Sequence, residues 1–275
     1  YKPKVGFSFG LNQLVLAEKI KLYFELESNA EYSLRKKAKR SKICSLNAHP
    51  VRKAVTLTLL DVSALKLFLN LTLPYLRTPK AQRLNFILDY FDLVHKQRLP
   101  QARVNLTKKS FRNDAWLTGF CDADGSFGLR QTLIGAHAKH KLTELTFILT
   151  QRQVQTGAQA SVATVFRRMA RFLKCTVTSV LMPASKGKPQ FRLKLTSAKS
   201  KKILRAYFDT YPLMSSKHYD YCDWCTADDL MKQNAHYSTA GQIEFLKLKA
   251  GVNQNRKVFT WVHLENWPVA KAVPF

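Results

Sequence analysis

The chain has 275 residues, of which 46% are hydrophobic and 23% are charged, a composition typical of one large or two medium folded domains. It contains no apolar run long enough to cross a bilayer, so we expect no membrane-spanning segment and no membrane partner. Lys and Arg outnumber Asp and Glu by 45 to 18, a formal net charge of +27, which makes a polyanion such as nucleic acid the expected partner.

The positive charge is spread along the whole chain. Residues 1–108 contain 20 basic and 7 acidic residues, a difference of +13, and residues 109–275 contain 25 and 11, a difference of +14. A protein that binds a membrane surface usually concentrates its charge on one amphipathic helix. The even distribution therefore favours nucleic acid over a membrane surface.

Signals for secondary structure occur twice in the same order. Each half carries an extended stretch, a helical stripe, an alternating strand and a further helix: 5–11, 14–24, 54–59 and 65–68, then 145–151, 162–172, 191–195 and 203–208. The segments 73–80 and 211–217 each introduce one more helix. We interpret this order as an internal duplication of an α/β unit, with the linker near 98–110.

Alternation within the strand at 191–195 separates an apolar face from a basic one. Phe191, Leu193 and Leu195 point one way, while Arg192 and Lys194 point the other. An antiparallel sheet with helices on its apolar face would present these cations to a duplex as a concave saddle.

A basic run lies between the strand signals of the first half, where we expect a hairpin tip that tracks phosphates. Its members are Arg35, Lys36, Lys37, Lys39, Arg40 and Lys42, continued by Arg52 and Lys53. A solvated loop is the alternative. Lys80 and Arg130 join Arg192 and Lys194 as the remaining basic residues expected to contact nucleic acid.

The segment 113–127 carries the strongest chemical signal. Asn113 or Asp114 is a good N-cap, and the apolar run at 116–121 predicts an internal helix. Gly119 and Ala123 lie four residues apart on one face, where another helix backbone could approach closely.

Two carboxylates, Asp122 and Asp124, fall in the last turn of this expected helix. The helix macrodipole disfavours a carboxylate at a C-terminus, so Asp124 needs a cation beside it. Gly125 is the expected left-handed residue that ends the helix. A surface carboxylate without a chemical role is the alternative for Asp124.

Residues 117–125, Leu-Thr-Gly-Phe-Cys-Asp-Ala-Asp-Gly, resemble the motif that names the LAGLIDADG homing endonuclease family, in its single-chain form with two repeats. The resemblance covers the second half and the first half from its second strand onward. It implies an α+β fold of two pseudo-symmetric αββαββα repeats, each with an antiparallel sheet that forms half of a basic saddle. The expected domains are a truncated first repeat with linker at 1–108 and a second repeat with a C-terminal helical extension at 109–275.

The resemblance also implies a site and a location. The final acidic residue of each motif helix holds a divalent metal ion in this family, so Asp124 would be the metal ligand here, with Gln151 and Lys217 as neighbouring candidate catalytic groups. Oxygen ligands suit Mg²⁺, which would generate hydroxide for phosphodiester hydrolysis and stabilise the leaving oxygen. An organellar location is implied, in the mitochondrion rather than the chloroplast.

One departure from the family pattern bears on function. No Asp-Gly or Glu-Gly dipeptide precedes residue 124, so we expect the first motif helix to be absent from these residues. A single carboxylate would hold Mg²⁺ weakly. The Gly119–Ala123 face would then be left open, so we expect a second polypeptide, further residues or a large assembly to cover it.

Two functions remain open at this point. We favour a non-cleaving derivative that binds structured RNA, either ribosomal or intron RNA, because a net charge of +27 exceeds what transient reading of one duplex needs. The alternative is an active, site-specific endonuclease that uses Mg²⁺ to hydrolyse organellar double-stranded DNA. In that case the first motif comes from further residues or from a second chain.

Overall fold

The structure is a computed structural model that describes residues 2–32, 42–95, 106–132, 142–154, 161–181 and 187–265. Its internal contacts divide the chain into two compact units. Unit 1 comprises Tyr1–Arg77, Ala81–Thr107 and Trp261–Phe275, and unit 2 comprises Thr78–Lys80 and Lys108–Thr260. Among the helices described, none is long and apolar enough to cross a membrane.

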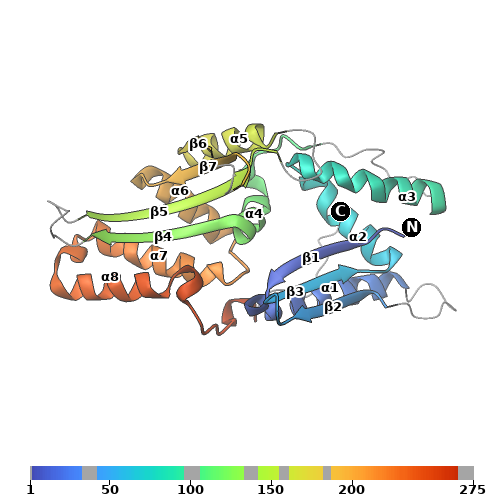
Figure 1. The fold of residues 1–275 in the computed structure, drawn as a ribbon, viewed down its shortest axis with the longest axis horizontal. Coiled ribbons are helices and arrows are strands. Elements are labelled where there is room, and N and C mark those ends of the chain that lie inside the picture. The colour runs from blue at the N-terminus through green and yellow to red at the C-terminus, as the bar shows by residue number, and fades with distance from the viewer. Residues whose placement is uncertain are drawn as a thin grey trace. The chain divides into compact units, whose positions relative to one another are not determined.

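Unit 1 contains a three-stranded antiparallel sheet with the strand order β1-β3-β2 (Figure 1). Its strands are β1 (Val5–Gly10), β2 (Cys44–His49) and β3 (Ala54–Leu59). Its helices are α1 (Leu14–Tyr32), α2 (Val62–Thr72) and α3 (Asn85–His95).

The apolar face of this sheet is set by alternation along its central strand. In β3, Val55, Leu57 and Leu59 are fully buried, and Thr56 and Thr58 lie on the opposite face. The inward side chains pack with those of α1, α2 and α3 in one core. The core therefore lies on the helix side of the sheet and leaves the other face open.

Unit 2 contains a four-stranded antiparallel sheet with the strand order β4-β5-β7-β6 (Figure 1). Its strands are β4 (Gly125–Thr132), β5 (Leu142–Arg152), β6 (Thr176–Val180) and β7 (Gln190–Leu195). Its helices are α4 (Trp116–Asp124), α5 (Ala163–Leu173), α6 (Ala198–Thr210), α7 (Lys217–Lys232) and α8 (Thr239–Gly251).

The core of unit 2 is rich in aromatic rings. Phe127 on β4 lies 5.1 Å from Phe147, 5.8 Å from Trp224 and 6.3 Å from Phe208, measured between ring centres. All four rings are almost completely buried. They hold β4 and β5 against α6 and α7. Because α4 leads directly into β4, the end of α4 lies at one end of the sheet.

The two units share an element order, which confirms the predicted duplication. The order β1-β3-β2 in unit 1 corresponds to β5-β7-β6 in unit 2, and α1 and α2 occupy the places of α5 and α6 in the chain. Within the described part of unit 1, nothing corresponds to α4 or β4. These two elements, with the motif that they carry, distinguish unit 2.

Most of the basic run predicted for the first half lies outside the described residues, in the chain after α1 ends at Tyr32 and before β2 begins at Cys44. A hairpin joins β2 to β3 and turns between Pro50 and Lys53, where the Lys53 N–H donates to the Pro50 carbonyl at 3.0 Å. Arg52 and Lys53 lie exposed on that turn.

Candidate functional site

Helix α4 is anchored at its start by groups from unit 2. The Asp114 carboxylate accepts a hydrogen bond from the Trp116 N–H at 3.1 Å, although Ala115, not Asp114, occupies the N-cap position. The Tyr207 hydroxyl of α6 donates to the Asp114 carbonyl at 2.8 Å and accepts from the Leu117 and Thr118 N–H groups at 3.1 and 3.3 Å. These bonds satisfy N–H groups that a helix start leaves without partners. The sequence held no signal for Tyr207.

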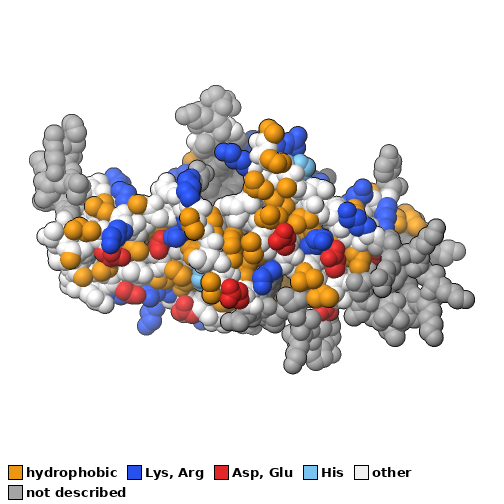
Figure 2. Space-filling view, turned by 90° about the horizontal axis from the view of Figure 1, so that it is seen from below, with side chains coloured by type: hydrophobic (Ala, Val, Ile, Leu, Met, Phe, Trp, Pro, Cys, Tyr) orange, Lys and Arg blue, Asp and Glu red, His pale blue; other side chains and the backbone are white. Residues whose placement is uncertain are grey.

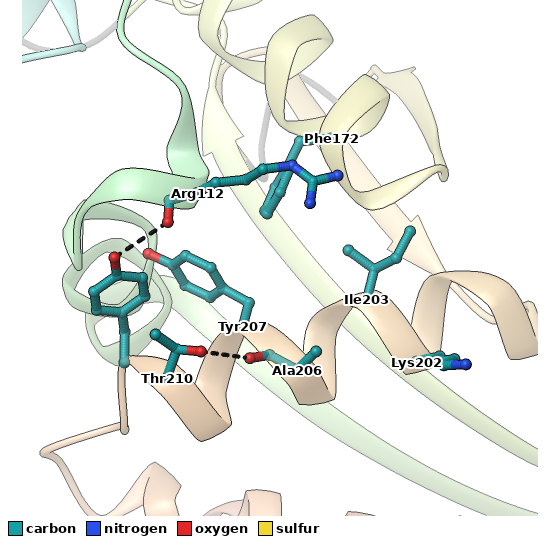
Figure 3. A pocket seen from close by; sticks show the side chains of 8 residues that line it. Arg112, Phe172, Lys202, Ile203, Ala206, Tyr207 and Thr210 are labelled. Atoms are coloured by element: carbon teal, nitrogen blue, oxygen red, sulfur yellow. Dashed lines mark hydrogen bonds between the residues drawn. The ribbon is translucent and has the colours of Figure 1, made fainter.

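A cavity of about 380 Å³ lies beside this anchor, between Arg112, Phe172 and α6 (Figure 3). The Arg112 guanidinium lies 5.6 Å from the centre of the Phe172 ring. The Tyr211 hydroxyl donates to the Arg112 carbonyl at 3.1 Å. The tyrosine hydroxyls beside the cavity thus hold the chain that leads into α4.

Lys217 caps the other end of α4. Its ammonium donates to the carbonyls of Asp122 and Ala123 at 2.8 and 3.0 Å. A cation at a helix C-terminus is favoured by the macrodipole. Burial lowers the pKa of Lys217, whereas the carboxylates of Asp122 and Asp124 act to raise it. Lys217 is therefore the cation that a carboxylate at this helix end needs.

Asp122 fastens α4 to the segment that leads into α7. Its carboxylate accepts hydrogen bonds from the Met214 N–H at 2.9 Å, the Ser215 N–H at 3.1 Å and the Ser215 hydroxyl at 2.6 Å. Burial raises the pKa of Asp122, and the hydrogen bonds from Ser215 and Met214 act to lower it. Asp122 on α4 thus binds the segment before α7, and Lys217 at the start of α7 binds the end of α4. The sequence showed Asp122 in the motif but not this role.

Asp124 is exposed at the end of α4 and is held from β5. The side-chain amide of Gln151 donates a hydrogen bond to its carboxylate. Asp124, Gln151 and Lys217, the three candidate catalytic residues, therefore gather at one end of the sheet. Each comes from a different element, so the fold alone brings them together.

Gly125 has a different role from the one predicted. Its backbone is extended, with φ −72° and ψ 153°, and it is the first residue of β4, so it is not a left-handed cap. A Cβ at this position would lie 2.7 Å from the Cys121 carbonyl oxygen and 3.0 Å from the Phe147 ring. Because α4 leads directly into β4, close approach, not a positive φ, requires glycine here.

The face of α4 that carries Gly119 and Ala123 is exposed. A Cβ at Gly119 would meet no atom within 4 Å. Leu117 and Cys121, in contrast, are buried in the core of unit 2. The helix is therefore internal on one face only, and the covering of the other face by a further molecule stays a prediction.

The outer face of the β4–β7 sheet carries the predicted cations. Arg130, Arg192 and Lys194 are exposed on it, opposite the buried face that includes Leu193 and Leu195. Within the described parts of the chain, neither Arg130 nor Arg192 forms an ion pair. Lys194 pairs with Glu144 of β5 at 3.0 Å, a contact that the sequence did not reveal.

The other predicted basic residues lie elsewhere. Lys42, Arg52 and Lys53 are exposed beside the strands of unit 1, and Lys80 is exposed near the start of the segment that leads to α3. Five more lie outside the described residues: Arg35, Lys36, Lys37, Lys39 and Arg40. The structure therefore does not place the centre of the predicted basic run.

The oxygen donors at the end of α4 match part of what Mg²⁺ requires. Asp124 offers a carboxylate, and the Gln151 amide that donates to it keeps its carbonyl oxygen free of described donors. Both are hard oxygen donors of the kind that Mg²⁺ prefers, while water completes its shell. In the ranges that the structure describes, no three His, Cys, Asp or Glu residues are grouped to hold a metal ion. The donor set fits Mg²⁺ but is a partial one.

The duplicated α+β fold, with an acidic helix end beside a sheet whose outer face carries cations, is similar to the fold of a solved LAGLIDADG homing endonuclease. A family model described as LAGLIDADG endonuclease matches residues 117–227, from within α4 to within α7. The meganuclease I-SmaMI bound to uncleaveable DNA superimposes with a TM-score of 0.67 and 18% identity, covering 92% of this chain and 88% of that one. The LAGLIDADG homing endonuclease I-GzeII in complex with its DNA target gives a TM-score of 0.65 and 16% identity, covering 93% and 89%.

Two curated relatives are similar in sequence. The intron-encoded DNA endonuclease aI3 of Saccharomyces cerevisiae is 24% identical over 241 residues, which are 78% of this chain but 58% of that protein. The probable intron-encoded endonuclease 4 of Neurospora crassa is 25% identical over 171 residues, 61% of this chain and 28% of that protein. The chain thus spans little more than half the length of the first and less than a third of the second. Residues 117–227 of this chain are thus similar to the LAGLIDADG endonuclease family.

Proposed function

We propose that this protein is a site-specific DNA endonuclease of the LAGLIDADG type. It binds double-stranded DNA on the outer face of the β4–β7 sheet and hydrolyses phosphodiester bonds at the end of α4. The observation that carries this proposal is the exposed Asp124 carboxylate, which Gln151 holds from β5. A surface carboxylate with no role would have no need of a supporting contact from another element.

In this proposal Asp124 and the Gln151 carbonyl would hold Mg²⁺, which when bound would supply an activated water and stabilise the leaving oxygen. Lys217 keeps α4 and its carboxylate in place through the carbonyls of Asp122 and Ala123. Asp122 fixes the segment before Lys217 through Met214 and Ser215. These residues position the acidic group and do not transfer protons themselves.

The site needs a second carboxylate for strong metal binding, because Mg²⁺ with one protein ligand is held weakly. We assign that group to a second motif helix that packs on the exposed Gly119–Ala123 face. Such a helix comes from a polypeptide segment beyond those described, in this protein or in a partner. The close-packing face supports this assignment, since small residues let two helix backbones approach.

The structured-RNA function favoured from the charge gains no support from the comparisons. The similar solved structures are DNA complexes, and the yeast relative is named a DNA endonuclease. A non-cleaving DNA-binding protein is the second candidate, favoured by the single motif carboxylate among the described residues. The names of the relatives support an intron-encoded origin, and we place the protein in an organelle, the mitochondrion.

The test compares the protein and its Asp124→Asn variant, each together with the second motif helix, on a plasmid library of candidate sites, with Mg²⁺ and with EDTA. We expect Mg²⁺-dependent double-strand cleavage by the wild type, loss of cleavage in Asp124→Asn, and equal DNA binding by both. Asp92→Asn, an exposed carboxylate on α3, is the matched control and should cleave normally. Binding without cleavage by the wild type would support the second candidate.

A further inference from the structure

Glu144 is the one acidic residue in the four described strands of the unit 2 sheet. Its neighbour Leu145 is buried in the core with Phe147 and Leu149, so alternation places Glu144 on the outer face. It lies directly across from Arg130 on β4. This is the face on which the proposed function places DNA.

The partner of Glu144 is a lysine from a different part of that face. Lys194 stands opposite Ile148 in the strand register, four residues along β5 from Glu144, yet its ammonium lies 3.0 Å from the Glu144 carboxylate. The Lys194 side chain therefore leans along the sheet toward Glu144. Arg130 and Arg192, in contrast, keep their charges free of ion pairs with the described residues.

Stability does not account for this pair. The Lys194 and Glu144 side chains are 45% and 27% exposed, and an ion pair in such a setting contributes little to folding. The pair also carries no net charge, so it adds nothing to phosphate attraction. Without Lys194, the Glu144 carboxylate would be repelled by the phosphates of a polyanion. The pair therefore presents a hydrogen-bond acceptor and a donor side by side without a net charge.

Small residues lie beside the pair, and one of them, Thr146, is only 8% exposed. Thr146 is the outward residue between Glu144 and Ile148 on β5, and Gly128 stands opposite it without a side chain. A Cβ at Gly128 would come within 2.3 Å of the Thr146 hydroxyl oxygen, so that hydroxyl already lies over the glycine. No large side chain from these two positions rises beside the pair.

We propose that the Glu144–Lys194 pair reads one C·G base pair in the major groove. The carboxylate accepts a hydrogen bond from the cytosine amino group, and the ammonium donates to the acceptors on the guanine edge. Arg130 and Arg192 make the phosphate contacts that hold the duplex in place. This assignment rests on the proposed DNA-binding function and makes Glu144 and Lys194 specificity residues.

The test uses the full chain and a randomised duplex library, followed by binding measurements on single-position variants of the selected site. Wild type should prefer C·G at one position by roughly 5- to 150-fold, the range of one good base contact. Glu144→Gln and Lys194→Gln should each lower the preference at that same position and leave the other positions unchanged. Glu144→Gln should not weaken binding to duplexes that lack the C·G pair.

The matched control is Glu244→Gln on α8, which removes the same charge from a pair with Lys247 at 3.6 Å. Figure 2 shows the α8 side of unit 2 at its left, where acidic and basic side chains are interspersed. This variant should keep every base preference. If Glu144→Gln tightens binding to all duplexes equally and leaves the base preferences unchanged, Glu144 only reduces the positive charge of this face. The inference is then wrong. If the wild type binds no duplex at all, the proposed function itself fails.

Discussion

The two sheets have the same strand order over three strands but different outer faces. The strands of unit 1 contain no Lys, Arg, Asp or Glu, whereas those of unit 2 present Arg130, Arg192, and Lys194 with Glu144. Inward residues determine how a sheet packs on its helices, so they keep their alternation in both units. Outward residues do not enter the core and are free to differ.

This difference changes how the matched charges of the two halves are understood. The first half carries +13 and the second +14, which by itself predicts phosphate contacts from both halves. In unit 1 the described cations nearest the sheet are beside the strands, at Lys42, Arg52 and Lys53. Charge recognition by the strands themselves is therefore assigned to unit 2, and the sheet of unit 1 offers hydroxyl, amide and glycine positions.

The largest expected effect comes from removing a ring from the aromatic core of unit 2. Phe127→Ala should lower the free energy of unfolding of unit 2 by about 3–5 kcal/mol, because a buried ring leaves a cavity. Leu57→Ala should destabilise unit 1 by about 2–5 kcal/mol. Segment-resolved hydrogen exchange measures each unit separately, and Phe86→Ala, 61% exposed, is the control. Equal loss of protection in both units from Phe127→Ala would show that the units do not fold separately.

A smaller effect is expected at the junction that unit 1 lacks. Asp122→Ala should cost unit 2 about 1–3 kcal/mol, because the Met214 and Ser215 donors lose their buried acceptor. Chemical denaturation followed by tryptophan fluorescence measures this loss of unfolding free energy. Asp124→Asn, at an exposed position two residues later, should change stability by less than about 0.5 kcal/mol. Similar losses from both variants would contradict the role given to Asp122.

The difference in charge between the outer faces of the two sheets can be reduced by substitution in either unit. Arg130→Gln combined with Arg192→Gln should reduce the slope of log affinity against log salt by about 1.8, since each phosphate contact contributes about 0.9. Thr58→Arg, on the outer face of β3 in unit 1, should raise the slope by about 0.9 if that sheet also lies along the duplex.

Fluorescence anisotropy with a fixed duplex, at salt concentrations from about 50 to about 200 mM, would measure these slopes. Lys247→Gln on α8 removes a charge from an exposed pair and serves as the control. An unchanged slope after loss of both arginines would place the phosphate contacts elsewhere.

The smallest effect on the chain alone is expected at Gly119. Gly119→Leu meets open space and replaces glycine within a helix, so the stability of the isolated chain should stay the same or rise by up to about 1 kcal/mol. Against a helix packed on that face, the same change should cost about 1–3 kcal/mol through overpacking. Thermal unfolding measures the effect on the isolated chain, and cleavage activity measures the effect on packing of the second helix. A destabilised isolated chain would show that this face is already covered.

Much of the architecture could be predicted because it depends on local pattern. The strand expected at 54–59 is found as Ala54–Leu59, and the inward alternation of 191–195 holds in β7, where Leu193 and Leu195 are buried. The motif segment predicted helix α4 and its acidic end. The hydrophobic periods of 2 residues in strands and 3.6 residues in helices are visible in the sequence, so these elements can be predicted without tertiary information.

The prediction for Gly125 was wrong because it depended on where the chain goes after the helix ends. Gly125 was expected to be left-handed because glycine commonly ends helices that way, but here the chain enters β4 at once and the glycine accommodates the Cys121 carbonyl and the Phe147 ring.

The sequence by itself determined the duplicated α+β order, the excess of positive charge and the acidic end of the motif helix. Only the tertiary structure decided that Gln151 and Lys217 meet that helix end, that Tyr207 and Asp122 hold the helix, and that Lys194 leans to Glu144. These contacts join residues that are distant in sequence, and their geometry depends on how helices pack on a sheet. A local pattern specifies which face a side chain takes, whereas its partner across the fold depends on the packing of the whole core.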